Sequence, residues 1–209
     1  SNDFRERLKV NGLETLTEQE LDEIDKEVGK IPLDGNAVAY LSFLISELNT
    51  HPKYGQKRSN DPTRIEEGCY LYNLVEGSGS RRQDKSIVRY AQSLAWLQDK
   101  KQADLEHVLT VAPYALWHRL RLTDETTGKL RDDQRTDPLN LYVVKTLLGD
   151  GTNEIPGVKK RFQESGKNYQ TVINFIQTND LESARKASEM YSANGKGHPI
   201  FIDLSQELK

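Results

Sequence analysis

Residues 77–101, "GSGSRRQDKSIVRYAQSLAWLQDKK", decide how the chain is interpreted, because a stretch of small residues runs straight into a helical pattern that opens on two arginines. Apolar residues recur at helical spacing over residues 87–96, which predicts a helix over about residues 82–99. The N-terminus of a helix is already electropositive, because its first N–H groups have no partner within the helix. Arg81 and Arg82 are therefore unfavourable there unless an anion lies nearby.

Two interpretations of these arginines are open on physical grounds. In one, Ser80 caps the helix, and Arg81 and Arg82 in its first turn form a phosphate site together with the free N–H groups. In the other, both arginine side chains are solvated or pair with a glutamate that lies near in the sequence. The glutamates available are Glu66, Glu67 and Glu76.

Two helices are predicted ahead of this segment. Thr17 and Glu20 have the spacing of a capping box, which indicates the start of a helix. A second helix, which either Asp34 or Asn36 would cap, runs to about residue 49. The apolar residues expected to be buried are Leu21, Ile24 and Val28 in the first helix, and Val38, Leu41, Leu44, Ile45 and Leu48 in the second.

The segments around the arginines have different patterns. Residues 50–68 are polar and broken by prolines, which predicts a loop, and residues 69–75 fit either a short strand or a helical turn. After the arginine-bearing helix, Asp104 is placed to cap another helix that continues to about residue 120. Pro113 is expected to kink or reset that helix, because proline lacks the N–H that a helix interior needs.

The last third of the chain is predicted to be helical as well. Residues 123–137 are polar, charged and without apolar periodicity, which is typical of a linker. Helical stretches are predicted over residues 138–148, 157–163, 169–178 and 181–191, and residues 198–208 fit a short strand or an ordered tail. Apolar residues between 172 and 190 either pack this part together or form an adaptor surface for a partner.

Composition excludes several classes of protein. The chain has 209 residues, of which 35% are hydrophobic and 29% charged, and this favours a solvated, mostly helical protein with thin cores. The net charge of −3 gives no basic excess with which to neutralise nucleic-acid phosphates. Cys69 is the single cysteine, so no intrachain disulfide and no cysteine zinc site can form, and a cytoplasmic setting is expected. The longest apolar run is far shorter than the roughly 20 residues of a membrane span.

Motifs of catalysis are absent from the sequence. Each of the four Gly-Lys pairs is followed by Ile, Leu, Asn or Gly, so no phosphate-binding loop of the G-x-x-x-x-G-K-[ST] type exists. No G-x-S-x-G motif occurs, and the four histidines lie too far apart to show metal-ligand spacing. We therefore expect no catalytic residue and no metal site, and we expect this chain alone to catalyse nothing.

The order of the predicted helices resembles the C-terminal lid subdomain of MoxR-type AAA+ ATPases. The resemblance is carried by residues 77–122, which close on "APYALWHRL" at residues 112–120, and by the two predicted helices before residue 50. It covers about residues 15–122 and rests on the ordered set rather than on one motif. It implies a mainly α fold in which an AAA+ lid-type helical bundle is followed by a second small helical module.

The resemblance also implies a role for the arginines. In that family a lid arginine, called sensor 2, contacts the γ-phosphate of bound ATP, and the match places it at Arg82. Arg81 falls where the family often has proline, so the expected nucleotide-binding residues are Arg82, Arg81 and Ser80. ATP and Mg²⁺ would be cofactors of a full-length parent, with none expected in this chain. The expected partners are a P-loop AAA+ domain of the same protein, neighbouring subunits of a ring, for which a hexamer is expected, and a client protein that is remodelled in a chaperone-like way.

These implications divide the chain into four parts. Residues 1–14 lead in, with residues 1–2 explained as the remnant of a tag; residues 15–122 are the lid-like domain, residues 123–137 a linker, and residues 138–209 a C-terminal helical extension. The chain would then be the C-terminal fragment of a MoxR-like ATPase, without its P-loop domain. The rival hypothesis is a free-standing helical protein-interaction module with no link to nucleotides. A nucleic-acid-binding module is disfavoured by the near-neutral charge.

Overall fold

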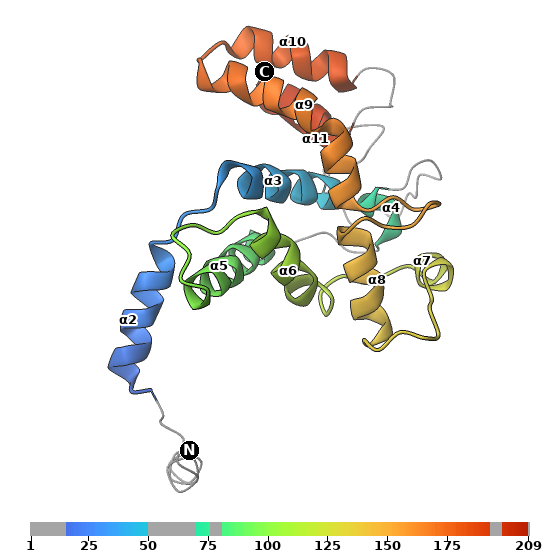
Figure 1. Ribbon diagram of the computed structural model, residues 1–209. Coiled ribbons are helices and arrows are strands. Elements are labelled where there is room, and N and C mark those ends of the chain that lie inside the picture. Colours follow the sequence, from blue (N-terminus) through green and yellow to red (C-terminus); the bar gives the residue numbers. More distant parts are fainter. Residues whose placement is uncertain (1–15, 50–69, 76–80, 193–197, 209) are drawn as a thin grey trace, which may run out of the picture.

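The computed structural model describes residues 16–49, 70–75, 81–192 and 198–208 (Figure 1). Over these residues every regular element is a helix, and the strand-like pairings are isolated β-bridges, so the prediction of a mainly α fold is confirmed. The helices are α2 (Glu18–Gly29), α3 (Gly35–Asn49), α4 (Leu71–Leu74), α5 (Arg81–Leu97), α6 (Leu105–Leu116), α7 (Asp124–Lys129), α8 (Leu139–Leu148), α9 (Val158–Gln177), α10 (Leu181–Ser192) and α11 (Pro199–Glu207).

Helix α3 lies at the centre of the molecule, with α5 and α6 on one side and α9, α10 and α11 on the other (Figure 1). It contacts α6, α9 and α11 directly. Tyr40, Phe43 and Leu44 are completely buried, as expected for a helix that is apolar on more than one face. Asp34, and not Asn36, caps the helix, since its Oδ1 accepts a hydrogen bond from the N–H of Ala37 at 2.7 Å.

The buried face of α3 differs from the predicted stripe. Val38, predicted to be buried, is 49% exposed, while Leu44 and Leu48 are buried as predicted. Glu47 is fully buried although it is charged. The difference arises because α3 is covered from two sides, by α6 and by α9, and apolar periodicity alone does not show the second side.

Helices α5 and α6 pack along each other, and α2 packs against α5 (Figure 1). The predicted capping box of α2 is present, with the N–H of Glu20 donating to the Thr17 hydroxyl and the N–H of Thr17 donating to the Glu20 carboxylate. Val28 at the end of α2 is buried, whereas Leu21 is 48% exposed. The predicted apolar stripe of α2 is therefore buried at its C-terminal end and exposed toward its N-terminus.

Helix α6 begins as predicted but ends earlier. The Asp104 carboxylate accepts a hydrogen bond from the N–H of His107. In return, Nδ1 of the buried His107 ring accepts from the backbone N–H of Asp104 at 3.2 Å. Pro113 lies inside the helix, which stops at Leu116 instead of continuing to about residue 120. The N–H that Pro113 lacks would have donated to the carbonyl of Leu109, so the proline weakens the turn before it, and the helix ends one turn later on the bond from the N–H of Trp117 to the carbonyl of Pro113.

The stretch predicted as a linker contains a helix of its own. Thr123 caps α7 by accepting from the N–H of Thr126 at 3.1 Å, and both threonines are buried. The Thr123 hydroxyl thus accepts from a free N–H group at the start of α7 instead of being bound by water. The buried apolar side chains form one continuous cluster that runs from Ile31 to Phe201. The proposed division of the chain at residues 122 and 138 stays a prediction.

One helix, α9, replaces the two that were predicted over residues 157–163 and 169–178. It runs through Gly166, which weakens a helix without breaking it. Phe162 and Tyr169, on either side of this glycine, both pack edge-on against Phe43, with ring centres 5.4 Å and 6.4 Å away. These contacts to α3 hold the two halves of α9 in line.

The C-terminal segment is a helix, which corrects the prediction of a strand or an ordered tail. His198 precedes α11, and its Nδ1 accepts a hydrogen bond from the N–H of Ile200 at 3.2 Å. Pro199 occupies the first helical turn, where a missing N–H costs nothing. The prediction failed because a histidine cap followed by proline is a weaker sequence signal than serine, threonine or aspartate.

Candidate functional site

The candidate phosphate site lies at the N-terminus of α5. Arg81 is the first residue of this helix and Arg82 the second, so both occupy the first turn, as predicted. Ser80 lies outside the described residues, and so do the side chains of Arg81 and Arg82. The predicted contact of these residues with phosphate therefore stays a prediction. The structure does describe the contacts that hold the rest of α5.

Helix α5 is anchored along one side by α2 and the turn that follows it. The guanidinium of Arg89 pairs with the carboxylate of Asp25. Gln92 Nε2 donates to the carbonyl of Ile31 at 2.7 Å, and Trp96 Nε1 donates to Glu27 Oε2 at 3.0 Å. The core side chains of the helix are Ile87, Ala91 and Ala95, all completely buried. With a buried face and a bonded face, α5 and its neighbours form a stiff unit.

A third face of α5 is open. Tyr90 is 51% exposed and Leu97 is 71% exposed. The two residues are seven apart, so they lie on the same side of the helix. Large apolar side chains along one exposed face are typical of a surface that another protein or domain can cover.

The segment before α5 is tied to the segment after α6. Residues 69–75 were predicted to be a strand or a helical turn, and the described part forms the helical turn α4. Val75, which follows it, pairs with Leu122 in an isolated bridge, and the N–H of Thr123 donates to the carbonyl of Leu74 at 3.3 Å. The chain is therefore fixed in place at Val75, six residues before the first arginine.

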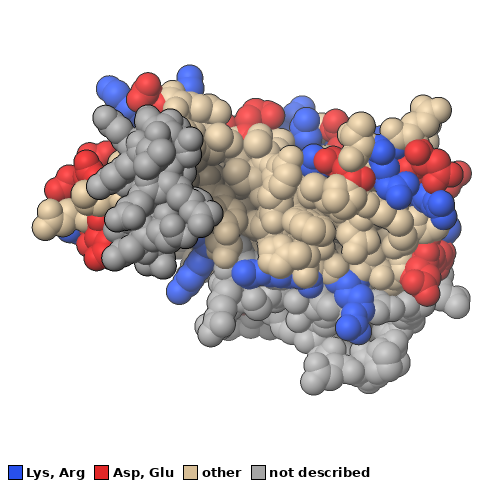
Figure 2. Space-filling view, turned by 90° about the horizontal axis from the view of Figure 1, so that it is seen from below, with Lys and Arg blue, Asp and Glu red and all other residues tan. Residues whose placement is uncertain are grey.

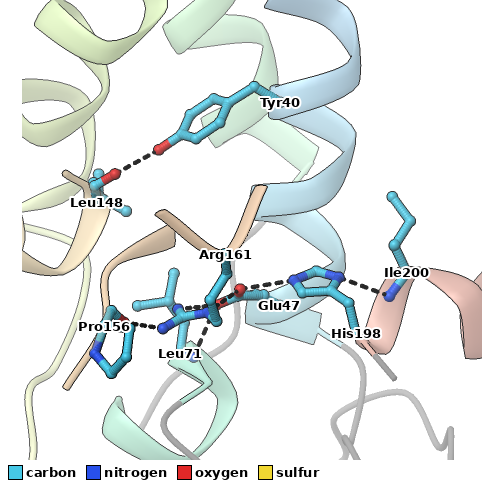
Figure 3. A network of polar contacts seen from close by, with 8 residues as sticks. All are labelled: Tyr40, Glu47, Leu71, Leu148, Pro156, Arg161, His198 and Ile200. Carbon is cyan, nitrogen blue, oxygen red and sulfur yellow. Dashed lines mark hydrogen bonds and ion pairs between the residues drawn. The ribbon is translucent and has the colours of Figure 1, made fainter. Parts of the chain in front are cut away.

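A buried polar cluster joins α3 and α4 to the C-terminal helices (Figure 3). Its centre is Glu47, whose Oε2 lies 2.5 Å from Nη2 of Arg161 and whose Oε1 lies 2.7 Å from Nε of the same side chain. Oε1 also lies 2.7 Å from Nε2 of His198. The backbone N–H of Leu71, the first residue of α4, donates to Oε2 at 3.2 Å. One carboxylate thus binds groups from three other segments.

The partners of Glu47 are themselves satisfied. Arg161 Nη1 donates to the carbonyl of Pro156, and its guanidinium carbon lies 5.5 Å from the centre of the Tyr70 ring. Nδ1 of His198 accepts from the N–H of Ile200, which assigns the proton to Nε2, the nitrogen that faces Glu47. The cluster is a fully bonded junction, because its hydrogen-bonding atoms are occupied by the protein itself.

Electrostatics fix the charge state of the cluster. Burial would raise the pKa of Glu47, but the Arg161 charge and the His198 hydrogen bond outweigh it and lower the pKa to about 2. Burial lowers the pKa of His198 to about 4, against the opposite effect of Glu47. Burial likewise raises the pKa of the Tyr40 hydroxyl, which donates to the carbonyl of Leu148 at 2.8 Å. At neutral pH the cluster is one buried ion pair with a neutral histidine.

Sequence reasoning missed this cluster. Glu47 sits within the apolar face of α3, and a charge in that position could have indicated a buried, paired carboxylate. Nothing in the sequence indicated its partners, because Arg161 lies 114 residues away and His198 151 residues away.

Other features of the described residues carry no comparable chemistry. An open cavity of about 350 Å³ lies between α6 and α8, but Lys145 on its wall is 2.7 Å from Asp137, and Lys159 is 3.8 Å from Asp150. Within the described ranges no group of three or more His, Cys, Asp or Glu residues could hold a metal ion. Among the same residues, none of the helices has both the length and the apolar character needed to cross a bilayer.

Charge is scattered over the face shown in Figure 2. Aspartate and glutamate side chains lie mainly toward the two ends and the upper edge, lysine and arginine side chains also line the lower border of the described part, and uncharged side chains cover much of the middle.

Comparison with known proteins finds a family match for part of the chain. Residues 76–138 match the family model described as the AAA lid domain. The match contains all of α5, α6 and α7 and begins five residues before Arg81. No curated protein and no solved structure matches the chain. The match supports an AAA+ lid subdomain over these residues, which agrees in this coarser form with the resemblance drawn from the sequence.

Proposed function

We propose that this chain provides the lid of a MoxR-like AAA+ ATPase and that the first turn of α5 senses the γ-phosphate of ATP. The observation that carries the proposal is the match of residues 76–138 to the AAA lid domain, with two arginines in the first turn of its first described helix. Arg82 is the favoured phosphate contact, with Arg81 and Ser80 beside it. The first-turn N–H groups would add to the positive potential there.

Arginine suits this role for physical reasons. It is always charged, and its planar fork can donate two hydrogen bonds to one phosphate group. A lid that gains this contact only when γ-phosphate is present would favour a closed arrangement with ATP and release it after hydrolysis. Because α5 is anchored to α2 through Arg89 and Trp96, movement of its first turn would carry the neighbouring helices along.

The nucleotide itself would be held mainly by another domain. This sequence has no phosphate-binding loop, so ATP and Mg²⁺ would be bound by a P-loop AAA+ domain of the same protein. The exposed side of α5 with Tyr90 and Leu97 is the surface we assign to that domain, because both are large apolar side chains that remain exposed on the helix that carries the two arginines. Subunits in a ring, with a hexamer favoured, and a client protein complete the proposed set of partners.

The test is ATP turnover in a protein in which a P-loop domain precedes this chain. Arg82→Ala is expected to lower turnover at least about tenfold, since a hydrogen bond to a charged group is worth about 1.5–3 kcal/mol. Arg131→Ala is the matched control, because Arg131 lies within the AAA lid match but is 62% exposed and pairs with Asp133. If Arg81→Ala lowers ATP turnover and Arg82→Ala does not, the phosphate contact is Arg81, one residue earlier than proposed. Full turnover in both variants would favour the rival, a helical interaction module with no link to nucleotides.

A further inference from the structure

The buried carboxylate of Glu47 has hydrogen-bond partners both in α4 and in the C-terminal part of the chain. On one side it accepts the backbone N–H of Leu71, which opens α4. On the other it is held by Arg161 of α9 and by His198 before α11 (Figure 3). No surface water is available to replace these partners, because the side chain of Glu47 is 0% exposed.

An isolated carboxylate cannot stay charged in such a place. Transfer of an ionised group from water to an apolar interior is unfavourable unless it is paired and hydrogen-bonded. Arg161 supplies the pairing charge, and two of its nitrogens reach both oxygens of Glu47. If α9 and α11 were to move away, Glu47 would have to take up a proton or turn toward water. Either change would weaken its hold on the N–H of Leu71.

Helix α4 depends strongly on that hold. It has four residues, too few to be stable by its own hydrogen bonds. Its N-cap, Tyr70, provides no side-chain hydrogen bond to the helix start. Tyr70 is itself in contact with the C-terminal groups, its ring centre lying 5.6 Å from that of His198 and 5.5 Å from the guanidinium carbon of Arg161. The start of α4 is thus held by groups of the C-terminal helices, while its end is tied to Leu122 and Thr123.

From these contacts we infer that Glu47 is a positioning residue through which the C-terminal helices α9 and α11 set the placement of α4, the last described helix before the arginine-bearing turn of α5. Only residues 76–80 separate α4 and Val75 from Arg81. The functional meaning of this inference rests on the proposed function, in which the first turn of α5 is the phosphate sensor. It assigns to the C-terminal helices the regulation of that sensor.

The first experiment is amide hydrogen exchange on the full chain carrying Arg161→Met. Exchange of the amides of residues 71–75 is expected to rise about tenfold relative to the amides of α6, as for loss of a hydrogen bond to a charged group. Lys145→Met is the matched control: it removes another ion-paired cation, bound to Asp137, that does not touch Glu47. A variant that merely destabilises the protein would raise exchange in α4 and α6 alike, and that result overturns the inference.

A gentler variant keeps the test decisive if Arg161→Met does not fold. Arg161→Lys retains the charge but loses the two-point contact with Glu47. It is expected to raise exchange at residues 71–75 selectively and by less than Arg161→Met. Unchanged exchange at these residues in a folded Arg161→Lys protein would contradict the inference.

The second experiment runs in the opposite direction, because coupling between two sites is reciprocal. Leu71→Pro removes the N–H that donates to Glu47, at the first helical position, where proline is tolerated. Leu71→Ala is its control, since it shortens the same buried side chain and keeps the N–H. Exchange of the amides of α11 is expected to be severalfold faster in Leu71→Pro than in Leu71→Ala, and equal exchange in the two would oppose the inference.

These readouts need no nucleotide, so the two proposals can fail separately. Selective loosening of residues 71–75, combined with arginine variants that leave ATP turnover unchanged, would retain the coupling and remove phosphate sensing. Loss of turnover in Arg82→Ala, combined with uniform exchange in Arg161→Met, would retain the sensor and remove the role of the C-terminal helices.

Discussion

Glu47 binds groups from three segments that are distant in the sequence, through Leu71, Arg161 and His198. Its pairing with Arg161 is buried, with the two side chains 0% and 10% exposed. Removing one member of a buried pair leaves an uncompensated charge, so Glu47→Gln is expected to lower the free energy of unfolding by about 3–5 kcal/mol. Urea unfolding at neutral pH measures this change.

Glu125→Gln provides the matched control for that substitution. Glu125 pairs with Lys129 on the surface, where the side chains are 68% and 52% exposed, and such pairs are worth at most about 1 kcal/mol. A loss in Glu47→Gln no larger than in Glu125→Gln would mean that the Glu47 carboxylate is not held as an ion pair.

His198 makes the stability depend on pH in a defined direction. Its pKa is lowered to about 4, below the usual 6.5, so the folded state favours the neutral ring. The resulting stability is fully present above about pH 6.5 and is lost as the pH falls toward about 4. Between pH 7.5 and pH 5 the loss from this residue is expected to be about 2 kcal/mol.

The measurement compares urea unfolding at these two pH values in the wild type, His198→Gln and His118→Gln. The His198→Gln protein should lack the part of the pH dependence that His198 supplies, while His118→Gln, which changes an exposed histidine, should behave like the wild type. Equal pH dependence in all three proteins would show that His198 does not titrate with a lowered pKa. Glu47 stays ionised throughout this range, because its pKa is about 2.

At the scale of single elements, α9 can be tested at two glycines. A Cβ added at Gly166 meets no atom within 4 Å, and the residue lies inside the helix, so Gly166→Ala should stabilise the protein by about 0.5–1 kcal/mol. Gly151, in the loop before α9, has φ of 76° and a Cβ there would lie 2.1 Å from the backbone N of Gly157. Gly151→Ala should therefore be destabilising.

Thermal unfolding of both variants tests whether residues 158–177 form one helix or two. If Gly166 instead marked a break between two helices, alanine there would be neutral or destabilising. A stabilising Gly151→Ala would in turn contradict the close approach of the two loop strands at Gly151 and Gly157.

The elements that were predicted correctly are those with local signals. Thr17 with Glu20, and Asp104 ahead of α6, mark helix starts within four residues, so no tertiary information is needed. The continuity of α9 and the helical state of α11 depend on packing against α3, which lies more than 100 residues earlier. Local patterns cannot carry that information: Gly166 fell between two predicted helices, and the histidine cap before Pro199 was too weak a signal for a helix start.

At the scale of the whole molecule, the elements around the candidate site were predicted in part, and its contact with phosphate stays a prediction. The start of α5 at its two arginines follows from apolar periodicity, and the lid assignment over residues 76–138 agrees with the resemblance seen in the sequence. The junction of Glu47 with Arg161 and His198 was not predicted, because it forms only when three distant segments meet. The chain also gives no sequence signal for the client or for the register of Arg81 against Arg82.

The chain alone should bind nucleotide weakly and hydrolyse none. Its sequence lacks a phosphate-binding loop, and a single arginine-bearing turn supplies too few contacts to replace one. Turnover measured on a preparation free of other ATPases checks this expectation, and measurable ATP hydrolysis by the isolated chain would contradict it.

The central claim, that the first turn of α5 contacts γ-phosphate, is tested most directly by comparing two nucleotides. In a protein that joins a P-loop domain to this chain, affinity for a non-hydrolysable ATP analogue and for ADP would be measured by calorimetry for the wild type, Arg82→Ala, Arg81→Ala and Arg131→Ala. The claim predicts that Arg82→Ala weakens binding of the ATP analogue about tenfold or more and leaves ADP binding within about twofold, with Arg131→Ala unchanged for both. Equal losses for the two nucleotides, or no loss for either in both first-turn variants, would contradict it.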